Sequence, residues 1–155
     1  MYMKVNLANI MEGMELQSYD NQAFINLKSG EIVYISQTAL LIAEDGEDFK
    51  HLPEWQQEEI QSALDITRGE GKYVRLPTSF NINEYEIMEN FCFSLPDADM
   101  QDALLSSIRG KGAFRRFKDN IYRFGIAEKW YDYRDTKYKE IAVEFCERYN
   151  ISYIE

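Results

Sequence analysis

The amino-terminal part of the chain carries two short apolar runs separated by a turn. Residues 23–27 and 32–35 are β-prone, and Gly30 between them can adopt a positive φ. This pattern predicts a β-hairpin over residues 22–36. A helix is expected before the hairpin, near residues 6–16.

The next segments alternate between helix and strand signals. A helix is predicted from Pro53, because a proline in the first turn has no N–H to satisfy, and it should stop near Gly69 or Gly71. Residues 73–76 then form a third strand. Between the hairpin and this helix, residues 44–48 hold four carboxylates and are expected to be an exposed loop.

Two further helices are predicted before the basic part of the chain. Asn83 stands three residues before Glu86 in the layout of a capping box, and Pro96 ends the helix that follows. Asp97 caps the next helix, which ends at Gly110.

The carboxyl-terminal part is predicted to be helical. One amphipathic helix follows Gly112, a longer one runs from about residue 127 to residue 149, and residues 151–154 supply a short last strand. In the first of these helices the apolar stripe consists of Phe114, Phe117, Ile121 and Phe124.

These elements together predict an α+β fold. A small antiparallel sheet, made of the hairpin and the third strand, is packed by helices, and the carboxyl-terminal half is helical. The length of 155 residues with 45% hydrophobic residues suits a single domain over 1–155. Its sheet-containing part covers about 1–80 and its helical part about 83–150.

The composition restricts the cellular setting. Residues 1–10 lack a sustained apolar region, and no window approaches the run of about 18 apolar residues that a membrane span needs. A cytoplasmic protein without a membrane partner is therefore expected. Cys92 and Cys146 fall at apolar helical positions without metal-ligand spacing, which predicts buried, reduced thiols.

Charge is distributed unevenly along this acidic chain, whose formal net charge is −10. Residues 109–139 hold ten Lys or Arg against four Asp or Glu, whereas residues 1–108 hold six basic and nineteen acidic residues. Such asymmetry indicates either a patch for an anionic partner or two sections that neutralise each other.

The basic segment from 109 to 123 is the candidate binding site. Its helix should turn its arginines outward, opposite the apolar stripe, with Asp119 at pairing distance from three of them. Outward guanidinium groups beside a helix amino terminus suit an anion such as phosphate. The alternative is a solvated face or internal ion pairing. The candidate anion-binding residues are Arg109, Lys111, Arg115, Arg116 and Arg123.

The last helix places a cation inside its apolar stripe. Arg134 lies on the same face as Trp130 and Tyr138, so its guanidinium needs a carboxylate or carbonyl partner, or must reach the edge. We expect Arg134 to be more buried than Arg115 or Arg116. Structural roles are assigned to Trp130, Arg134 and Asp119.

Residues 110–119 read Gly-Lys-Gly-Ala-Phe-Arg-Arg-Phe-Lys-Asp and are followed by Trp130 and by Arg134-Asp135. With the hairpin and the acidic helix before them, these features resemble an uncharacterised bacterial protein family of unknown function over most of the chain. The strand at 73–77 matches that family less closely. The resemblance implies the domain limits and a bacterial cytosolic origin, and it brings no activity.

Catalytic chemistry is not indicated. His51 is the only histidine and has no triad-like neighbours in sequence, so a surface position is expected. The acidic residues 44–48 lack the twelve-residue calcium-loop pattern. Five glutamates on the polar faces of two helices are interpreted as solubility residues: Glu58, Glu59, Glu84, Glu86 and Glu89. No catalytic residue, metal or cofactor is predicted.

The leading hypothesis is a non-enzymatic binding or protein-interaction module that uses residues 109–123 to engage an unknown protein or a small anionic ligand. One alternative is an enzyme acting on a phosphorylated small molecule. Another is a nucleic-acid-associated regulator, favoured by tyrosines among the basic residues but opposed by a sequence pI near 4.7. The oligomeric state is left open.

Overall fold

The computed structural model describes residues 4–69, 72–79 and 81–155, and its fold is α+β as predicted. The chain divides into two compact units. The first consists of residues 1–78 and 142–155, and the second of residues 79–141.

The first unit is built on a three-stranded antiparallel sheet with strand order β3-β2-β4. Strand β2 (Asn21–Asn26) pairs with β3 (Ile32–Ser36) and with β4 (Tyr73–Arg75). The predicted hairpin and third strand are therefore confirmed. Three successive residues at the centre of β2 are buried, which is the pattern of a strand covered on both faces.

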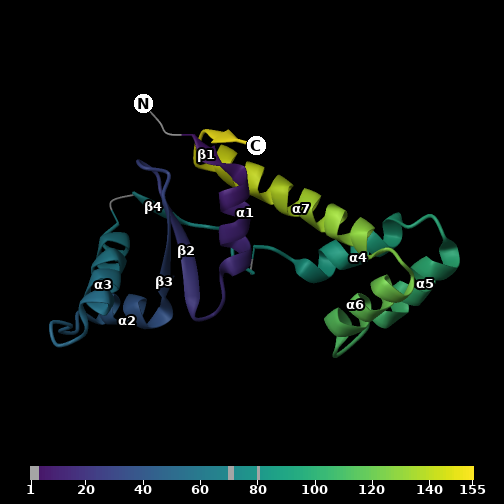
Figure 1. The fold of residues 1–155 in the computed structure, drawn as a ribbon, viewed down its shortest axis with the longest axis horizontal. Coiled ribbons are helices and arrows are strands. Elements are labelled where there is room, and N and C mark those ends of the chain that lie inside the picture. The colour runs from purple at the N-terminus through teal and green to yellow at the C-terminus, as the bar shows by residue number, and fades with distance from the viewer. Residues whose placement is uncertain (1–3, 70–71, 80) are drawn as a thin grey trace. The chain divides into compact units, whose positions relative to one another are not determined.

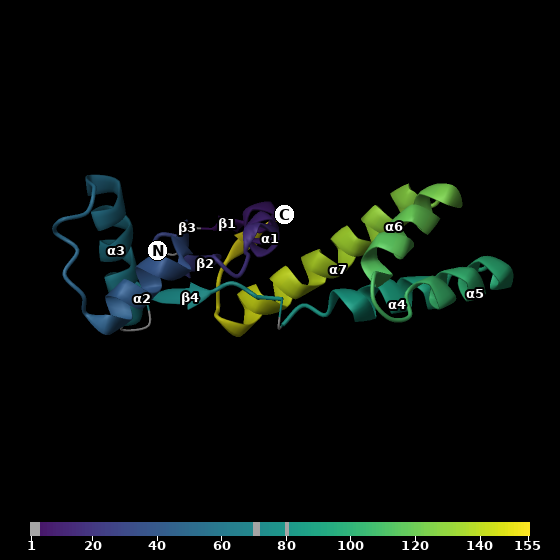
Figure 2. The same ribbon diagram turned by 90° about the horizontal axis from the view of Figure 1, so that it is seen from below.

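Helices cover the two faces of this sheet (Figures 1 and 2). Helix α1 (Leu7–Leu16) packs on one face, where Gly13 lies so close to the sheet that an added Cβ would be 2.5 Å from Leu76 Cδ1. Helices α2 (Gln37–Asp45) and α3 (Glu54–Thr67) cover the other. The core between them consists of Phe24, Ile35, Ala39, Leu40, Ala43, Ile60 and Ala63.

Helix α2 was not predicted, and it corrects the expected loop at 44–48. The Ser36 side chain accepts a hydrogen bond from the backbone N–H of Ala39, and Gly46 ends the helix at φ 69°. Because the helix continues to Asp45, only the later part of the acidic stretch is loop; all five of its residues are exposed.

The ends of α3 agree with the prediction to within a residue or two. Pro53 is the cap residue rather than the first helical residue, and the last helical residue is Thr67, shortly before Gly69. Gly71, the other predicted stop, lies outside the described residues.

A second, very short sheet joins distant parts of the sequence within the first unit. Strand β1 (Val5–Asn6) pairs in parallel with β5 (Tyr153–Ile154). The predicted last strand is confirmed, and its partner was not foreseen.

The second unit is helical. It contains α4 (Glu84–Ser94), α5 (Ala98–Ser107), α6 (Ala113–Arg123) and the part of α7 (Ala127–Arg148) that precedes Ala142. The caps predicted at Asn83 and Asp97 are present, since each side chain accepts backbone N–H groups from the first turn.

Aromatic rings form much of the core of the second unit. Phe91 meets Trp130 at 5.3 Å between ring centroids and Phe117 at 6.2 Å, both edge-on. The rings of Phe117 and Trp130 lie 4.8 Å apart. These contacts hold the inner side of α6 against α4 and α7.

Both cysteines are free and buried, as predicted. Burial raises the pKa of the Cys92 thiol and of the Cys146 thiol to about 11 each. Cys92 belongs to the second unit and Cys146 to the first, so each unit holds one protected thiol.

Candidate functional site

The buried side of α6 differs in one residue from the predicted stripe. Phe117 and Ile121 are buried, but Phe114 is 57% exposed. The prediction for Phe114 was wrong because this ring lies at the edge of the stripe in the first turn, where the small side chain of Ala113 takes the buried position. An aromatic ring therefore stands among the exposed cations.

Arg116 is committed to the backbone. Its guanidinium donates hydrogen bonds to the carbonyl oxygens of Ser107 at 2.7 Å, Arg109 at 2.6 Å and Lys111 at 2.5 Å. Ser107 is the last residue of α5, so this one half-buried side chain satisfies carbonyls at the end of that helix and along the turn into α6. The guanidinium therefore points to these carbonyls and not to solvent, which corrects the outward orientation predicted for Arg116; its part in anion binding stays a prediction.

Gly112 makes this arrangement possible. Its φ of 77° is in the left-handed region, and an added Cβ would lie 3.0 Å from Nη1 of Arg116. A residue with a side chain here would be strained and would also crowd the guanidinium.

The other cations of the segment are exposed and unpaired. Among the described residues of the second unit, none of them has a carboxylate oxygen within 4.0 Å, and Asp119 likewise makes no ion pair there. Pairing with the carboxylates of residues 81–108, one part of the alternative considered for this segment, is thus not found. The exposed cations are Arg109, Lys111, Arg115, Lys118 and Arg123.

Aromatic and cationic side chains share one side of α6. Phe114, Lys118 and Tyr122 are four residues apart in turn and form a stripe, with Arg115 next to Tyr122 on the helical wheel. Tyr122 is 58% exposed. These four residues are called the α6 outer face.

Tyr122 is linked to α7 at the end of this face. Its hydroxyl lies 3.3 Å from the hydroxyl of Tyr131, and this hydrogen bond raises the pKa of Tyr122 above its ordinary value. The phenol therefore stays neutral near pH 7 and adds no negative charge to the outer face.

Arg134 has the carboxylate partner that its position in the apolar stripe required. Its Nη2 lies 2.7 Å from Oε1 of Glu84 and 2.9 Å from the hydroxyl of Tyr138, which also hydrogen-bonds to Glu84. The guanidinium carbon lies 4.1 Å from the centre of the Tyr138 ring. This cluster joins the first residue of α4 to α7 and corrects the interpretation of Glu84 as a solubility residue. Arg115 is exposed, as expected, whereas Arg116 is half-buried like Arg134, so the expected difference in burial holds only for Arg115.

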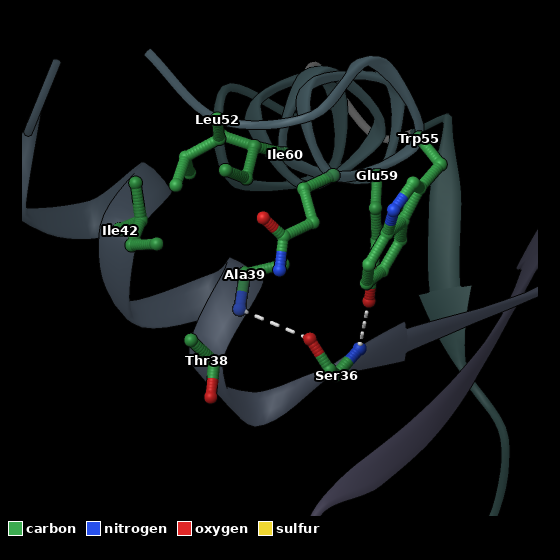
Figure 3. A pocket seen from close by; sticks show the side chains of 9 residues that line it. Ser36, Thr38, Ala39, Ile42, Leu52, Trp55, Glu59 and Ile60 are labelled. Carbon is green, nitrogen blue, oxygen red and sulfur yellow. Dashed lines mark hydrogen bonds between the residues drawn. The ribbon is translucent and has the colours of Figure 1, made fainter. Parts of the chain in front are cut away.

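The first unit contains a pocket that sequence reasoning missed. It has a volume of about 260 Å³ and lies between α2 and α3 (Figure 3). Trp55 stands at its rim with 64% of its surface exposed. We call it the Trp55 pocket; Ser36, Thr38, Ala39, Ile42, Leu52, Trp55, Gln56, Glu59 and Ile60 line it.

The interpretation of Glu59 as a solubility residue was wrong, because this side chain lines the pocket. It is half-buried, and its Oε1 accepts a hydrogen bond of 2.7 Å from the backbone N–H of Ser36. Glu58 is exposed, as expected. A sequence signal was available: Trp55 lies off the apolar stripe of its helix, which runs through Ile60 and Ala63, so its ring has no core position to fill.

A second hollow of about 430 Å³ carries the cations Lys28, Arg68 and Lys72 together with Asp65. It adjoins the carboxyl end of α3, where the helix dipole is negative. The negative end of the dipole stabilises the charge of Arg68 and disfavours a bound anion. The hollow is therefore a weaker anion site than its three cations suggest.

The single histidine of the sequence, His51, lies within the described ranges. His51 is exposed before α3, as predicted. Within those ranges, no group of three or more histidine, cysteine, aspartate or glutamate residues is arranged to hold a metal ion. In the same part of the chain, no helix combines the length and the apolar character needed to cross a bilayer.

The fold and the exposed, cation-bearing α6 define an α+β protein with a candidate binding helix. The chain belongs to the uncharacterised protein family UPF0158, whose family model matches residues 2–155. Comparison with curated proteins and with solved structures gave no match. That residues 110–119 are the mark of this family stays a prediction.

Proposed function

We propose that the protein is a bacterial cytosolic, non-enzymatic interaction module that binds an acidic segment of another protein through the α6 outer face. The observation that carries this proposal is the coexistence of unpaired cations and exposed rings on one helix. Aromatic residues and arginine are enriched at protein interfaces, where rings fill pockets of the partner and charges select it.

The chemistry of the face favours a protein over the other anionic partners. Phe114 is an apolar anchor that inorganic phosphate would leave in water, whereas an acidic segment with apolar residues covers both the ring and the cations. Nucleic acid is disfavoured because the net charge of −10 repels a polyanion at long range.

Arg109, Lys111 and Arg123 extend the proposed site beyond the outer face. Arg109 and Lys111 lie in the turn before α6, and Arg116 donates hydrogen bonds to both of their carbonyl oxygens. Their backbone is therefore fixed, while their side chains are exposed. Arg116 contributes by fixing the turn.

The test is an NMR titration of the full chain at low ionic strength with a peptide that combines glutamates and leucines. We expect saturable shifts at residues 109–123, weakened about tenfold when Arg115→Ala is combined with Lys118→Ala. Phe114→Ala should weaken binding without loss of fold, because its ring is exposed.

The matched control is Lys28→Ala with Lys50→Ala, which removes the same charge from exposed positions in the first unit. This variant should bind the peptide as the unmodified chain does. If both double variants bound the peptide equally weakly, the loss of affinity would come from the change in net charge and not from the α6 outer face. Shifts at 109–123 with an oligonucleotide or inorganic phosphate, and none with the peptide, would contradict the proposed partner class.

A further inference from the structure

The α2–α3 segment combines a pocket with a strong negative charge. Residues 36–60 hold seven Asp or Glu against one lysine, and this segment supplies every residue of the Trp55 pocket. At physiological salt a charge acts on a ligand within a Debye length of about 8 Å, and Glu59 lines the pocket itself. A ligand of positive charge is therefore attracted to the pocket.

The lining divides into an apolar floor and a polar end (Figure 3). Ile42 and Leu52 lie at one end in this view, and the lining also includes the buried Ile60 and Ala39. Trp55 and Glu59 lie at the other end, and because they are four residues apart on α3 they share one face of the helix.

The Glu59 carboxylate and the Trp55 indole have interaction capacity left for a ligand. Oε1 of Glu59 accepts the Ser36 N–H, whereas Oε2 has no hydrogen bond or ion pair among the described residues. The indole of Trp55 is exposed and has no hydrogen-bond partner in the same part of the chain. A carboxylate oxygen and the face of an indole are the two groups that best attract a cation.

We infer that the Trp55 pocket binds an arginine side chain from a peptide segment of a partner protein. The methylene stem packs on Ile42 and Leu52, the guanidinium stacks on Trp55, and one N–H donates to Oε2 of Glu59. Arginine fits better than lysine because its planar, weakly hydrated head stacks on aromatic faces. The volume of about 260 Å³ is below the range of typical small-molecule sites, as a single side chain requires.

This site is separate from the α6 outer face. It lies in the other unit and selects the opposite charge, so either site can fail its test while the other stands.

The Trp55 indole N–H resonance of the full chain provides the measurement. Trp130, the only other tryptophan, is 6% exposed, and Trp55→Phe assigns the signal. A blocked Gly-Arg-Gly peptide should shift this resonance with saturation. The citrulline analogue, which keeps the shape and lacks the charge, should leave it unmoved, and the lysine analogue should bind several-fold more weakly.

Glu59→Gln is the decisive variant. The amide oxygen can still accept the Ser36 N–H while the charge is lost, so the fold is kept and arginine affinity should fall about tenfold. Glu58→Gln removes the same charge from the exposed neighbouring position and should leave the affinity unchanged within about twofold.

Several results would overturn the inference. One is an equal shift of the Trp55 resonance with the citrulline and the arginine peptides. Another is tighter binding of the lysine peptide than of the arginine peptide. A third is an equal loss of arginine affinity in Glu59→Gln and Glu58→Gln. A Trp55 signal that moves with protein concentration alone would show instead that a second copy of the chain fills the pocket.

Discussion

The α2–α3 segment and the α6 segment are strongly charged stretches of opposite sign. Residues 36–60 carry an excess of carboxylates, and residues 109–123 hold six Lys or Arg against one aspartate. In each stretch an aromatic residue, Trp55 or Phe114, is more than half exposed. The two differ in shape, because one ring borders a pocket and the other stands on the outer side of a helix.

In each stretch a half-buried charged side chain is hydrogen-bonded to the backbone. Arg116 donates to three carbonyls, and Glu59 accepts one N–H from Ser36. Their neighbours Arg115 and Glu58 are exposed. Adjacent residues of the same type therefore have different roles, and the number of charges in a segment overstates the number available to a ligand.

Arg116→Ala is expected to have the largest effect on stability. It removes three hydrogen bonds from a charged donor and leaves the carbonyls of the turn unsatisfied, so the free energy of unfolding should fall by about 2–3 kcal/mol. Arg115→Ala, at an exposed site, should change it by less than about 0.5 kcal/mol. Urea denaturation followed by circular dichroism measures both. Similar values for the two variants would contradict the structural role of Arg116.

Thiol labelling locates the effect of Arg116→Ala. With a thiol pKa of about 11, only about one molecule in a thousand carries the reactive thiolate at pH 8, so Cys92 and Cys146 should both label slowly in the folded protein. In the variant, Cys92 should label faster while Cys146 changes less, because Cys92 lies in the same unit as Arg116. Mass spectrometry of labelled peptides distinguishes the two sites. Faster labelling of Cys146 alone would place the damage in the other unit.

Arg134→Met tests a cation that is held by a carboxylate instead of by carbonyls. The side chains of Arg134 and Glu84 are 24% and 29% exposed, so breaking their 2.7 Å pair should cost about 2 kcal/mol. Lys137→Ala breaks the more exposed pair with Glu140 and should cost less than about 0.5 kcal/mol. Thermal unfolding compares the two, and an equal cost would mean that the Arg134 cluster adds no more than a surface pair.

Gly112→Ala separates backbone strain from crowding of Arg116. Both Gly112 and Gly110 have a φ near 76–77°, but an added Cβ meets a heavy atom within 4 Å only at Gly112. Gly110→Ala should cost about 1 kcal/mol from the left-handed backbone, and Gly112→Ala somewhat more. Chemical denaturation should give this order, and the reverse order would argue against the close approach.

Glu59→Ala should cost less than Arg116→Ala or Arg134→Met, about 1 kcal/mol, because it removes one acceptor from a half-buried N–H. Glu59→Gln restores an acceptor and should be nearly neutral. The difference between the two variants, measured by thermal unfolding, gives the value of the Ser36 hydrogen bond. No difference would mean that water replaces the side chain.

Local signals were sufficient for most of the secondary structure. The caps at Asn83 and Asp97 and the β-prone runs around Gly30 each specify their element from a few adjacent residues. Helix α2 was missed because residues 39–43 form a short apolar run that suits a strand as well as a helix. Its capping residues, Ser36 and Gly46, lie outside that run.

The candidate sites were less predictable than the fold. Charge counting located α6 but could not assign Arg116, because its carbonyl partners at Ser107 and Arg109 belong to another helix and to a turn. The Trp55 pocket depends on the packing of α2 against α3, which is tertiary information. The spacing of residues within one helix predicts neither the carbonyl contacts of Arg116 nor the packing that forms the pocket.

The pairing of β1 with β5 has a consequence for synthesis on the ribosome. Val5 finds its strand partner only at Tyr153, so the first unit remains incomplete until that residue has left the exit tunnel. The helical unit ends at Ile141, so at the usual rate of about 5–20 residues per second it emerges about 1–2 seconds earlier. The inserted helical unit can therefore fold while the sheet-bearing unit still waits for its closing strand, which exposes the edge of β1 to nascent-chain chaperones for that interval.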